Sequence, residues 1–97
     1  MKTVPFDAAE HLTSARAQRE LLVDALETGD ASYIAAALGT VARARGMAKI
    51  AEAAGLTRAS LYKALSPAGD PQLTTLLGVL NAMGFSLTVK PRKKKAA

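Results

Sequence analysis

The sequence predicts an all-α domain of five helices followed by one short C-terminal β-strand. Over most of the chain, apolar residues recur at helical spacing between glycines and helix-capping residues. This spacing changes to a period of two only at residues 85–90. A length of 97 residues allows one domain, which we place at residues 1–89, followed by a basic tail at 90–97.

The composition predicts a thin core. Apolar residues make up 49% of the chain, but 21 residues are alanine and only four are aromatic. Such a small domain gains stability from a partner. The lack of cysteine excludes disulfide scaffolds and thiolate metal sites and suits a reducing cytosol. The sequence shows neither a secretion signal nor a long apolar stretch, so we expect a soluble cytoplasmic protein with no membrane partner.

Two helices are predicted before residue 29. Asp7, followed three residues later by glutamate, resembles a capping box and predicts a short helix at residues 8–12. Thr13 or Ser14 can cap a longer helix, which ends at Gly29 because glycine tolerates the left-handed conformation of a helix C-cap.

The next helix is predicted between Asp30, as its N-cap, and Gly46. Ile34, Leu38 and Val41 give it an apolar stripe that faces a core. Arg45 follows on the same stripe, where its charge complements the dipole at the end of the helix. Two short helices are predicted at residues 47–54 and 58–65, and Thr57 is predicted to cap the second. The last helix is predicted to start at the cap pair Asp70-Pro71 and to end at Gly84.

Residues 85–90 are predicted as the strand. Phe85, Leu87 and Val89 share one side of it, and no strand elsewhere in the sequence is an obvious mate. We therefore expect this edge to pair with another chain. The tail at 90–97 repels itself and is expected to be disordered, acting as a solubility tag, a nonspecific phosphate contact or a targeting signal.

The segment at residues 47–66 is predicted to be a helix-turn-helix. Its two short helices are joined through Gly55 at the spacing that lets them cross at a steep angle, and Ala51 lies where they approach. In this arrangement the second helix enters the major groove of DNA and the first crosses the backbone. The residues assigned to the turn and its packing are Ile50, Ala51, Gly55, Leu56 and Leu61.

The outward face of the second helix is small, polar and basic, which suits DNA. Arg58 can make two parallel hydrogen bonds to guanine, and Thr57 and Ser60 can contact a base or a phosphate. Tyr62 can contact a thymine methyl group or a phosphate. The residues assigned to DNA are Lys49, Thr57, Arg58, Ala59, Ser60, Tyr62 and Lys63. Two short helices with a glycine turn are also common in helical proteins that do not bind DNA.

Several sequence blocks strongly resemble the addiction-module antidote family, which belongs to the phage-repressor/Cro helix-turn-helix superfamily, also called XRE-like. The likeness extends from about Val4 to Val89. Its most specific parts are Leu61-Tyr62-Lys63-Ala64-Leu65-Ser66 and the opening Phe6-Asp7-Ala8-Ala9-Glu10; Ala59 departs from the glutamate of the motif.

The resemblance implies a lambda-repressor-like, dimeric antitoxin of a type II toxin-antitoxin module. Such proteins bind operator DNA, repress their own operon and neutralise a RelE-like ribonuclease toxin. It also implies that the C-terminal strand pairs across the dimer. Two alternatives stay open, namely a stand-alone XRE-type transcriptional regulator without a toxin and a helical adaptor that binds protein and not DNA.

The residue types do not favour an enzyme. His11 is the single histidine, and with no cysteine a metal site would need carboxylates. Ser60, Tyr62 and Lys63 do not converge on a helix as a nucleophile set would. We therefore expect no catalytic residues, cofactor, metal or small-molecule substrate.

The net charge of +5 arises from the tail. Residues 90–97 carry five basic side chains and no acidic ones, so residues 1–89 are neutral overall. The DNA prediction therefore depends on the spacing and on a few outward residues, because the overall charge of the predicted domain is balanced.

Overall fold

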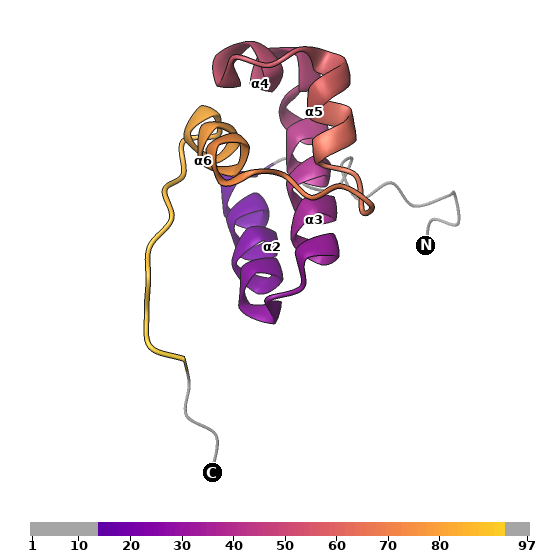
Figure 1. The fold of residues 1–97 in the computed structure, drawn as a ribbon. Helices are drawn as coiled ribbons and strands as arrows, with labels where there is room; N and C mark the ends of the chain where they lie inside the picture. Colours follow the sequence, from indigo (N-terminus) through magenta and orange to yellow (C-terminus); the bar gives the residue numbers. More distant parts are fainter. Residues whose placement is uncertain (1–13, 93–97) are drawn as a thin grey trace, which may run out of the picture.

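The computed structural model describes residues 14–92, and this part of the chain is all-helical (Figure 1). It contains five helices, which are α2 (Ala15–Thr28), α3 (Ala31–Arg45), α4 (Met47–Ala54), α5 (Arg58–Ala64) and α6 (Leu73–Ala82). The short helix predicted at residues 8–12 lies outside the described residues.

Helices α2 and α3 form an antiparallel hairpin. The Ser14 hydroxyl accepts a hydrogen bond from the backbone N–H of Ala17 at 3.1 Å and caps α2, as the sequence predicts. The helix ends at Gly29 with a φ of 70°, a left-handed conformation that favours glycine. The Asp30 carboxylate then accepts from two backbone N–H groups of the first turn of α3.

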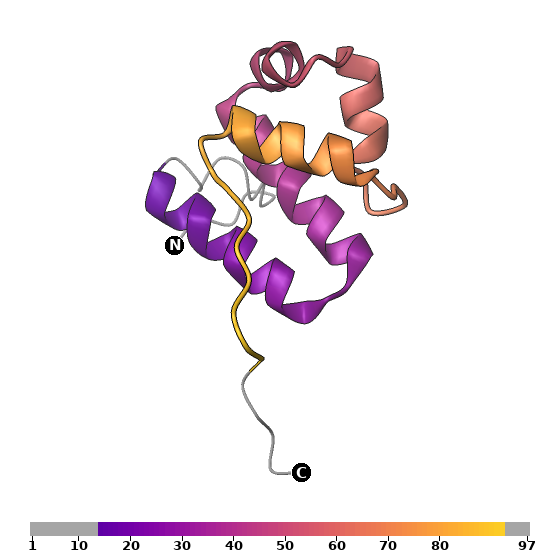
Figure 2. The same cartoon turned by 60° about the vertical axis from the view of Figure 1, so that its left-hand side comes forward.

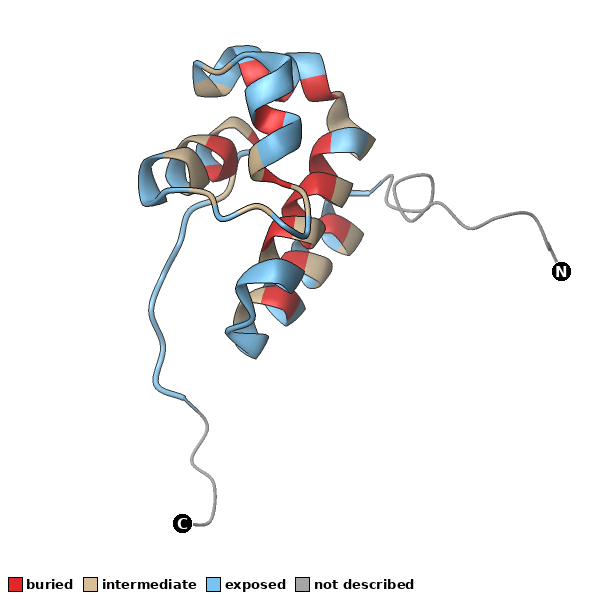
Figure 3. Cartoon of the chain, turned by 45° about the vertical axis from the view of Figure 1, so that its right-hand side comes forward, coloured by how far each residue is buried: buried red, intermediate tan, exposed pale blue. Residues whose placement is uncertain are grey.

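Helices α4 and α5 lie at one end of this hairpin, and α6 packs against α4 and crosses in front of α3 (Figure 2). Apolar residues of all five helices, or directly following them, meet in one core, and the buried faces point inward (Figure 3). The largest fully buried side chains are Leu38, Leu61, Val41 and Val79. Alanines at positions 25, 35 and 42 have no exposed surface, and such small residues allow the helices to approach closely.

The start predicted for the last helix is wrong. Helix α6 begins at Leu73, and its N-cap is Gln72, which makes no side-chain capping hydrogen bond. Residues 66–72 instead connect α5 to α6, through a turn in which the Gly69 N–H donates to the Ser66 carbonyl at 2.8 Å. Asp70 and Pro71 are part of this connection, so their local preference for a helix start is overridden.

The C-terminal strand is likewise not seen in the described residues. Residues 85–90 follow an extended path past α2 (Figure 2) but have no β-ladder there, because a strand needs a paired neighbour. The segment is held at both ends. The Phe85 N–H donates to the Leu80 carbonyl at 2.9 Å, and the Lys90 ammonium donates to the Glu27 carboxylate at 2.7 Å.

Arg45 joins three parts of the chain. Its Nε donates to the Gln18 side chain of α2 at 2.7 Å, and its Nη1 donates to the Met83 carbonyl after α6 at 2.7 Å. The guanidinium also lies 5.4 Å from the centre of the Phe85 ring. Gln18 is buried, so this contact satisfies a polar group inside the fold. The end of α3 therefore fixes where the C-terminal segment leaves the domain.

Candidate nucleic-acid interface

Two backbone hydrogen bonds close the C-terminal end of α4 at the turn that leads into α5. The Gly55 N–H donates to the Glu52 carbonyl at 3.1 Å, and the Leu56 N–H donates to the Ala51 carbonyl at 2.8 Å. This pattern is the Schellman motif, which needs a left-handed residue after the helix. Gly55 supplies that conformation with a φ of 75°. The chain can therefore turn sharply within three residues and start α5 across the end of α4.

The inner residues of this pair hold α5 against the domain. Ile50, Ala51 and Leu61 are buried, and Leu56 is half-buried against the same core. Leu61 has no exposed surface. Because it follows Ser60 and precedes Tyr62, burying it directs its neighbours on α5 to the outside.

The first turn of α5 is fixed by two hydroxyl groups. The Thr57 Oγ1 accepts from the Ser60 N–H at 3.0 Å, which caps the helix. The Thr57 hydroxyl also donates to the Ser60 Oγ at 2.8 Å. Thr57 therefore caps α5, as the sequence predicts, and positions the start of this helix.

The outer surface of α5 carries all the residues that the sequence assigned to DNA on this helix. Arg58, Ala59, Ser60, Tyr62 and Lys63 are exposed, and so is Lys49 on α4. The Arg58 guanidinium lies 5.8 Å from the centre of the Tyr62 ring, one turn further along the helix. This cation–π contact restricts the Arg58 side chain while its donors remain open to solvent. Residues 46–66 contain one acidic residue, Glu52, and three basic ones, Lys49, Arg58 and Lys63.

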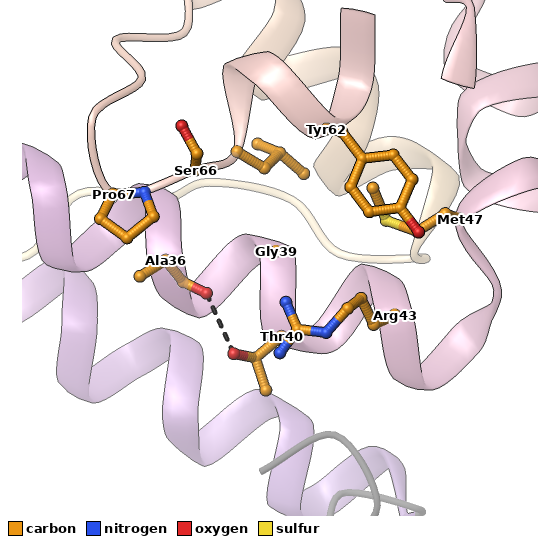
Figure 4. A pocket seen from close by; sticks show the side chains of 9 residues that line it. Ala36, Gly39, Thr40, Arg43, Met47, Tyr62, Ser66 and Pro67 are labelled. Atoms are coloured by element: carbon orange, nitrogen blue, oxygen red, sulfur yellow. Dashed lines mark hydrogen bonds between the residues drawn. The ribbon is translucent and has the colours of Figure 1, made fainter. Parts of the chain in front are cut away.

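A groove beside α5 was not predicted. It has a volume of about 310 Å³ and lies between α3 and α5, with Tyr62 and Met47 on one side and Thr40 and Arg43 on the other (Figure 4). Gly39 is at its floor, where an added Cβ atom would lie 2.7 Å from the Leu65 carbonyl oxygen. A glycine within an alanine-rich helix was the available sequence signal for this close approach.

Tyr62 belongs to both features, because its side chain lines the groove and its ring also contacts the Arg58 guanidinium. Two hydroxyl groups of the lining are bonded to nearby carbonyls. Thr40 donates to the Ala36 carbonyl at 3.1 Å, and Ser66 donates to the Lys63 carbonyl at 3.1 Å.

No group of metal-ligating side chains occurs within residues 14–92, and no described helix is long and apolar enough to span a membrane. His11 lies outside the described residues.

A family model described as a probable addiction module antidote protein matches residues 2–91. The chain belongs to this family. It is also 42% identical over 85 residues to an uncharacterized protein of Haemophilus influenzae, with 88% of each chain covered. No solved structure matches the chain. Membership in an antidote family is consistent with an antitoxin role and implies a toxin as partner.

Proposed function

We propose that this antidote-family protein neutralises a toxin and also represses its own operon by binding operator DNA as a dimer. The carrying observation is the outer face of α5, where Arg58 is exposed and held against Tyr62. The capped start of α5 and the glycine turn before it are the parts that a helix-turn-helix requires. The superfamily proposed for the domain is the phage-repressor/Cro one.

In this proposal α5 enters the major groove and Arg58 reads a guanine through O6 and N7. The Tyr62 ring restricts the guanidinium before binding, which lowers the entropy lost on contact. Lys49 and Lys63 neutralise phosphates on either side, and Ser60 contacts a base or a phosphate. Two copies occupy half-sites about 34 Å apart. Residues 85–89 pair between the two copies and form the strand that one chain lacks.

The DNA part is tested by measuring binding to the DNA upstream of the gene and to a scrambled duplex of equal length. Arg58→Ala is expected to reduce the preference for the upstream DNA by about 5- to 150-fold, which corresponds to about 1–3 kcal/mol. Arg16→Ala is the matched control, because Arg16 is also exposed but lies on α2 beside Glu20. An unchanged preference in Arg58→Ala would refute the base-reading role.

We further propose that the toxin is a basic RelE-like ribonuclease and that α2 contributes to its binding. Glu20, Asp24 and Glu27 are exposed along this helix and suit a basic partner. Expression of the neighbouring short reading frame is expected to arrest growth, and co-expression of this chain is expected to restore it. Growth that stays arrested would contradict the antitoxin role. Growth that is never arrested would favour a stand-alone regulator.

A further proposal is that the protein binds and does not catalyse, without a cofactor. The salt dependence of DNA affinity distinguishes the repressor from the alternative, a helical adaptor that binds protein and not DNA. If several phosphates are neutralised, DNA affinity falls steeply between 50 and 200 mM salt, by roughly 10³-fold or more for six contacts. The family membership favours the antitoxin over the adaptor.

A further inference from the structure

The groove between α3 and α5 has apolar walls and a positive charge at one end. Met47, Tyr62, Leu65 and Pro67 supply the apolar walls, and Tyr62 remains 46% exposed. Of the nine described residues that line the groove, Arg43 is the charged one, and Figure 4 shows it across from the Tyr62 ring. A fitting occupant therefore combines a large apolar side chain with a negative charge.

Small residues of α3 leave this space open. Ala36, Gly39, Thr40 and Arg43 recur every three or four residues, so they lie on one side of the helix. Ala36 and Gly39 have little or no side chain to place in the groove. The space of about 310 Å³ is thus left unfilled by the described side chains, although protein interiors are otherwise closely packed.

Two segments of this chain lie outside the described residues, and their charges differ. Residues 93–97 contain three lysines and no carboxylate, so the positive end of the groove repels them. Residues 4–10 contain Phe6, followed by the carboxylates of Asp7 and Glu10. This opening is among the most specific parts of the family resemblance, and neither the candidate DNA face nor the acidic side of α2 includes it. Its composition matches the apolar walls and the positive end of the groove.

The segment before α2 can reach the groove. Near the start of α2, the Gln18 side chain accepts a hydrogen bond from Arg45 at 2.7 Å. The chain therefore enters α2 beside the end of α3 that carries Arg43. An extended chain covers about 3.3 Å per residue, so the eight steps from Ser14 back to Phe6 span up to about 26 Å. A helix with its side chains is about 10 Å across, so this length suffices to pass around α3.

We propose that residues 4–10 bind in the groove between α3 and α5 of their own chain. The Phe6 ring fills the apolar centre beside the Tyr62 ring, where two aromatic rings can pack edge to face. The Asp7 carboxylate faces Arg43 at the positive end. The apolar contact supplies most of the binding, because an exposed ion pair contributes little.

Other occupants match the groove less well. Phosphates of a duplex suit Arg43 but not the apolar centre, and a basic toxin brings a like charge to Arg43. Tyr62 also contacts the Arg58 guanidinium, so a segment packed against its ring restricts the side chain that holds Arg58. Residues 4–10 thus support the candidate DNA face without contacting DNA. The docking itself does not depend on DNA binding.

Fluorescence tests whether the segment is buried in the groove. The chain contains no tryptophan, so Phe6→Trp places a single probe in the full chain. Without DNA or toxin, the probe is expected to emit at a shorter wavelength than in urea and to be quenched several-fold less efficiently by acrylamide. A probe as exposed in the folded chain as in urea would overturn the proposal.

A second substitution shows where the probe is buried. Ala36→Arg, added to Phe6→Trp, fills the groove and is expected to return the emission and quenching to their values in urea. Ala31→Arg is the matched control, because Ala31 is exposed at the start of the same helix and does not line the groove. Unchanged circular dichroism shows that both variants are folded. Emission that ignores Ala36→Arg would place the probe elsewhere and overturn the site.

A disulfide tests the contact without changing Phe6. The chain contains no cysteine, so Ala8→Cys and Thr40→Cys introduce two thiols with no competitor. Mild oxidation is expected to join them within one chain several-fold faster than Ala8→Cys joins Thr74→Cys on α6, and mass spectrometry identifies the product. Equal rates would overturn the site, and a bond between two chains would overturn docking within the same chain. An exposed fluorescent probe, with alkylation of Thr40→Cys slowed only by added duplex DNA, would assign the groove to DNA instead.

Discussion

The packing of α3 against the end of α5 can be tested at Gly39, with Gly78 as its control. A Cβ atom added at Gly39 would lie 2.7 Å from the Leu65 carbonyl oxygen, which is backbone and cannot rotate away. At Gly78 the nearest atom, the Ala54 carbonyl oxygen, would be 3.7 Å away, an ordinary contact. Both glycines lie inside helices, so alanine gains about 1 kcal/mol of helix propensity at each position.

The two substitutions are therefore expected to change stability in opposite directions. Overpacking costs about 1–3 kcal/mol, and a contact with rigid backbone falls at the upper end. Gly39→Ala is then expected to lose about 2 kcal/mol, which lowers Tm by about 8–16 °C in a domain of this size. Gly78→Ala is expected to gain about 1 kcal/mol and to raise Tm by about 4–8 °C.

Thermal unfolding followed by circular dichroism at 222 nm measures both changes. A Gly39→Ala variant as stable as Gly78→Ala would show that α3 and the end of α5 are further apart than in this structure. The close approach of Gly39 to the Leu65 carbonyl would then be refuted. Because Gly39 also forms the floor of the groove beside Tyr62, operator binding by Gly39→Ala is expected to weaken even where the variant is folded.

Two further substitutions test contacts described above, and one truncation tests the basic tail. Arg45→Ala removes hydrogen bonds to Gln18 and to the backbone after α6. Urea unfolding is expected to show that the free energy of unfolding falls by about 2–4 kcal/mol. An unchanged midpoint of unfolding would argue against this role of Arg45. Thr57→Ala removes the cap of α5 and is expected to lower the free energy of unfolding by about 1 kcal/mol, whereas Thr57→Ser retains the cap. Equal losses of stability in both variants would contradict the capping role. Deletion of residues 91–97 is expected to weaken the binding of every DNA sequence about equally and to reduce the salt dependence of this binding. A loss of the preference for operator DNA would show that the tail reads bases.

The helix ends could be predicted because they depend on single residues. Gly29, Gly46, Gly55 and Gly84 all have positive φ values, and each follows a helix or its final turn at the place where the sequence predicts a stop. Glycine adopts this conformation without the cost that a Cβ atom imposes. The caps at Ser14 and Asp30 follow from equally local rules.

Features that depend on the assembled chain could not be predicted in this way. The sequence pattern relates Arg45 only to the dipole of its own helix, although its hydrogen-bond partners lie 27 and 38 residues away in sequence. The cap pair Asp70-Pro71 is favourable locally, but the connection between α5 and α6 takes up both residues. The period of residues 85–90 indicates a strand, yet a ladder requires a neighbour that residues 14–92 of one chain do not provide.

The outer residues of α5 illustrate both cases. Their exposure follows from the helical period around Leu61 and could be foreseen. The cap by Thr57 depends on one local residue and could also be foreseen. The contact between Arg58 and Tyr62 depends on side-chain conformations that periodicity does not determine. The groove between α3 and α5 depends on tertiary packing around Gly39.

The position of Arg45 links the order of folding to the order of association. Its guanidinium holds the carbonyl of Met83 and the ring of Phe85, and it can do so only when α2, α3 and α6 are already packed together. A partly folded chain therefore has no fixed exit for residues 85–90 and offers no ordered backbone edge to another molecule. In the proposed dimer, residues 85–90 would therefore take their position for pairing only after the core has formed.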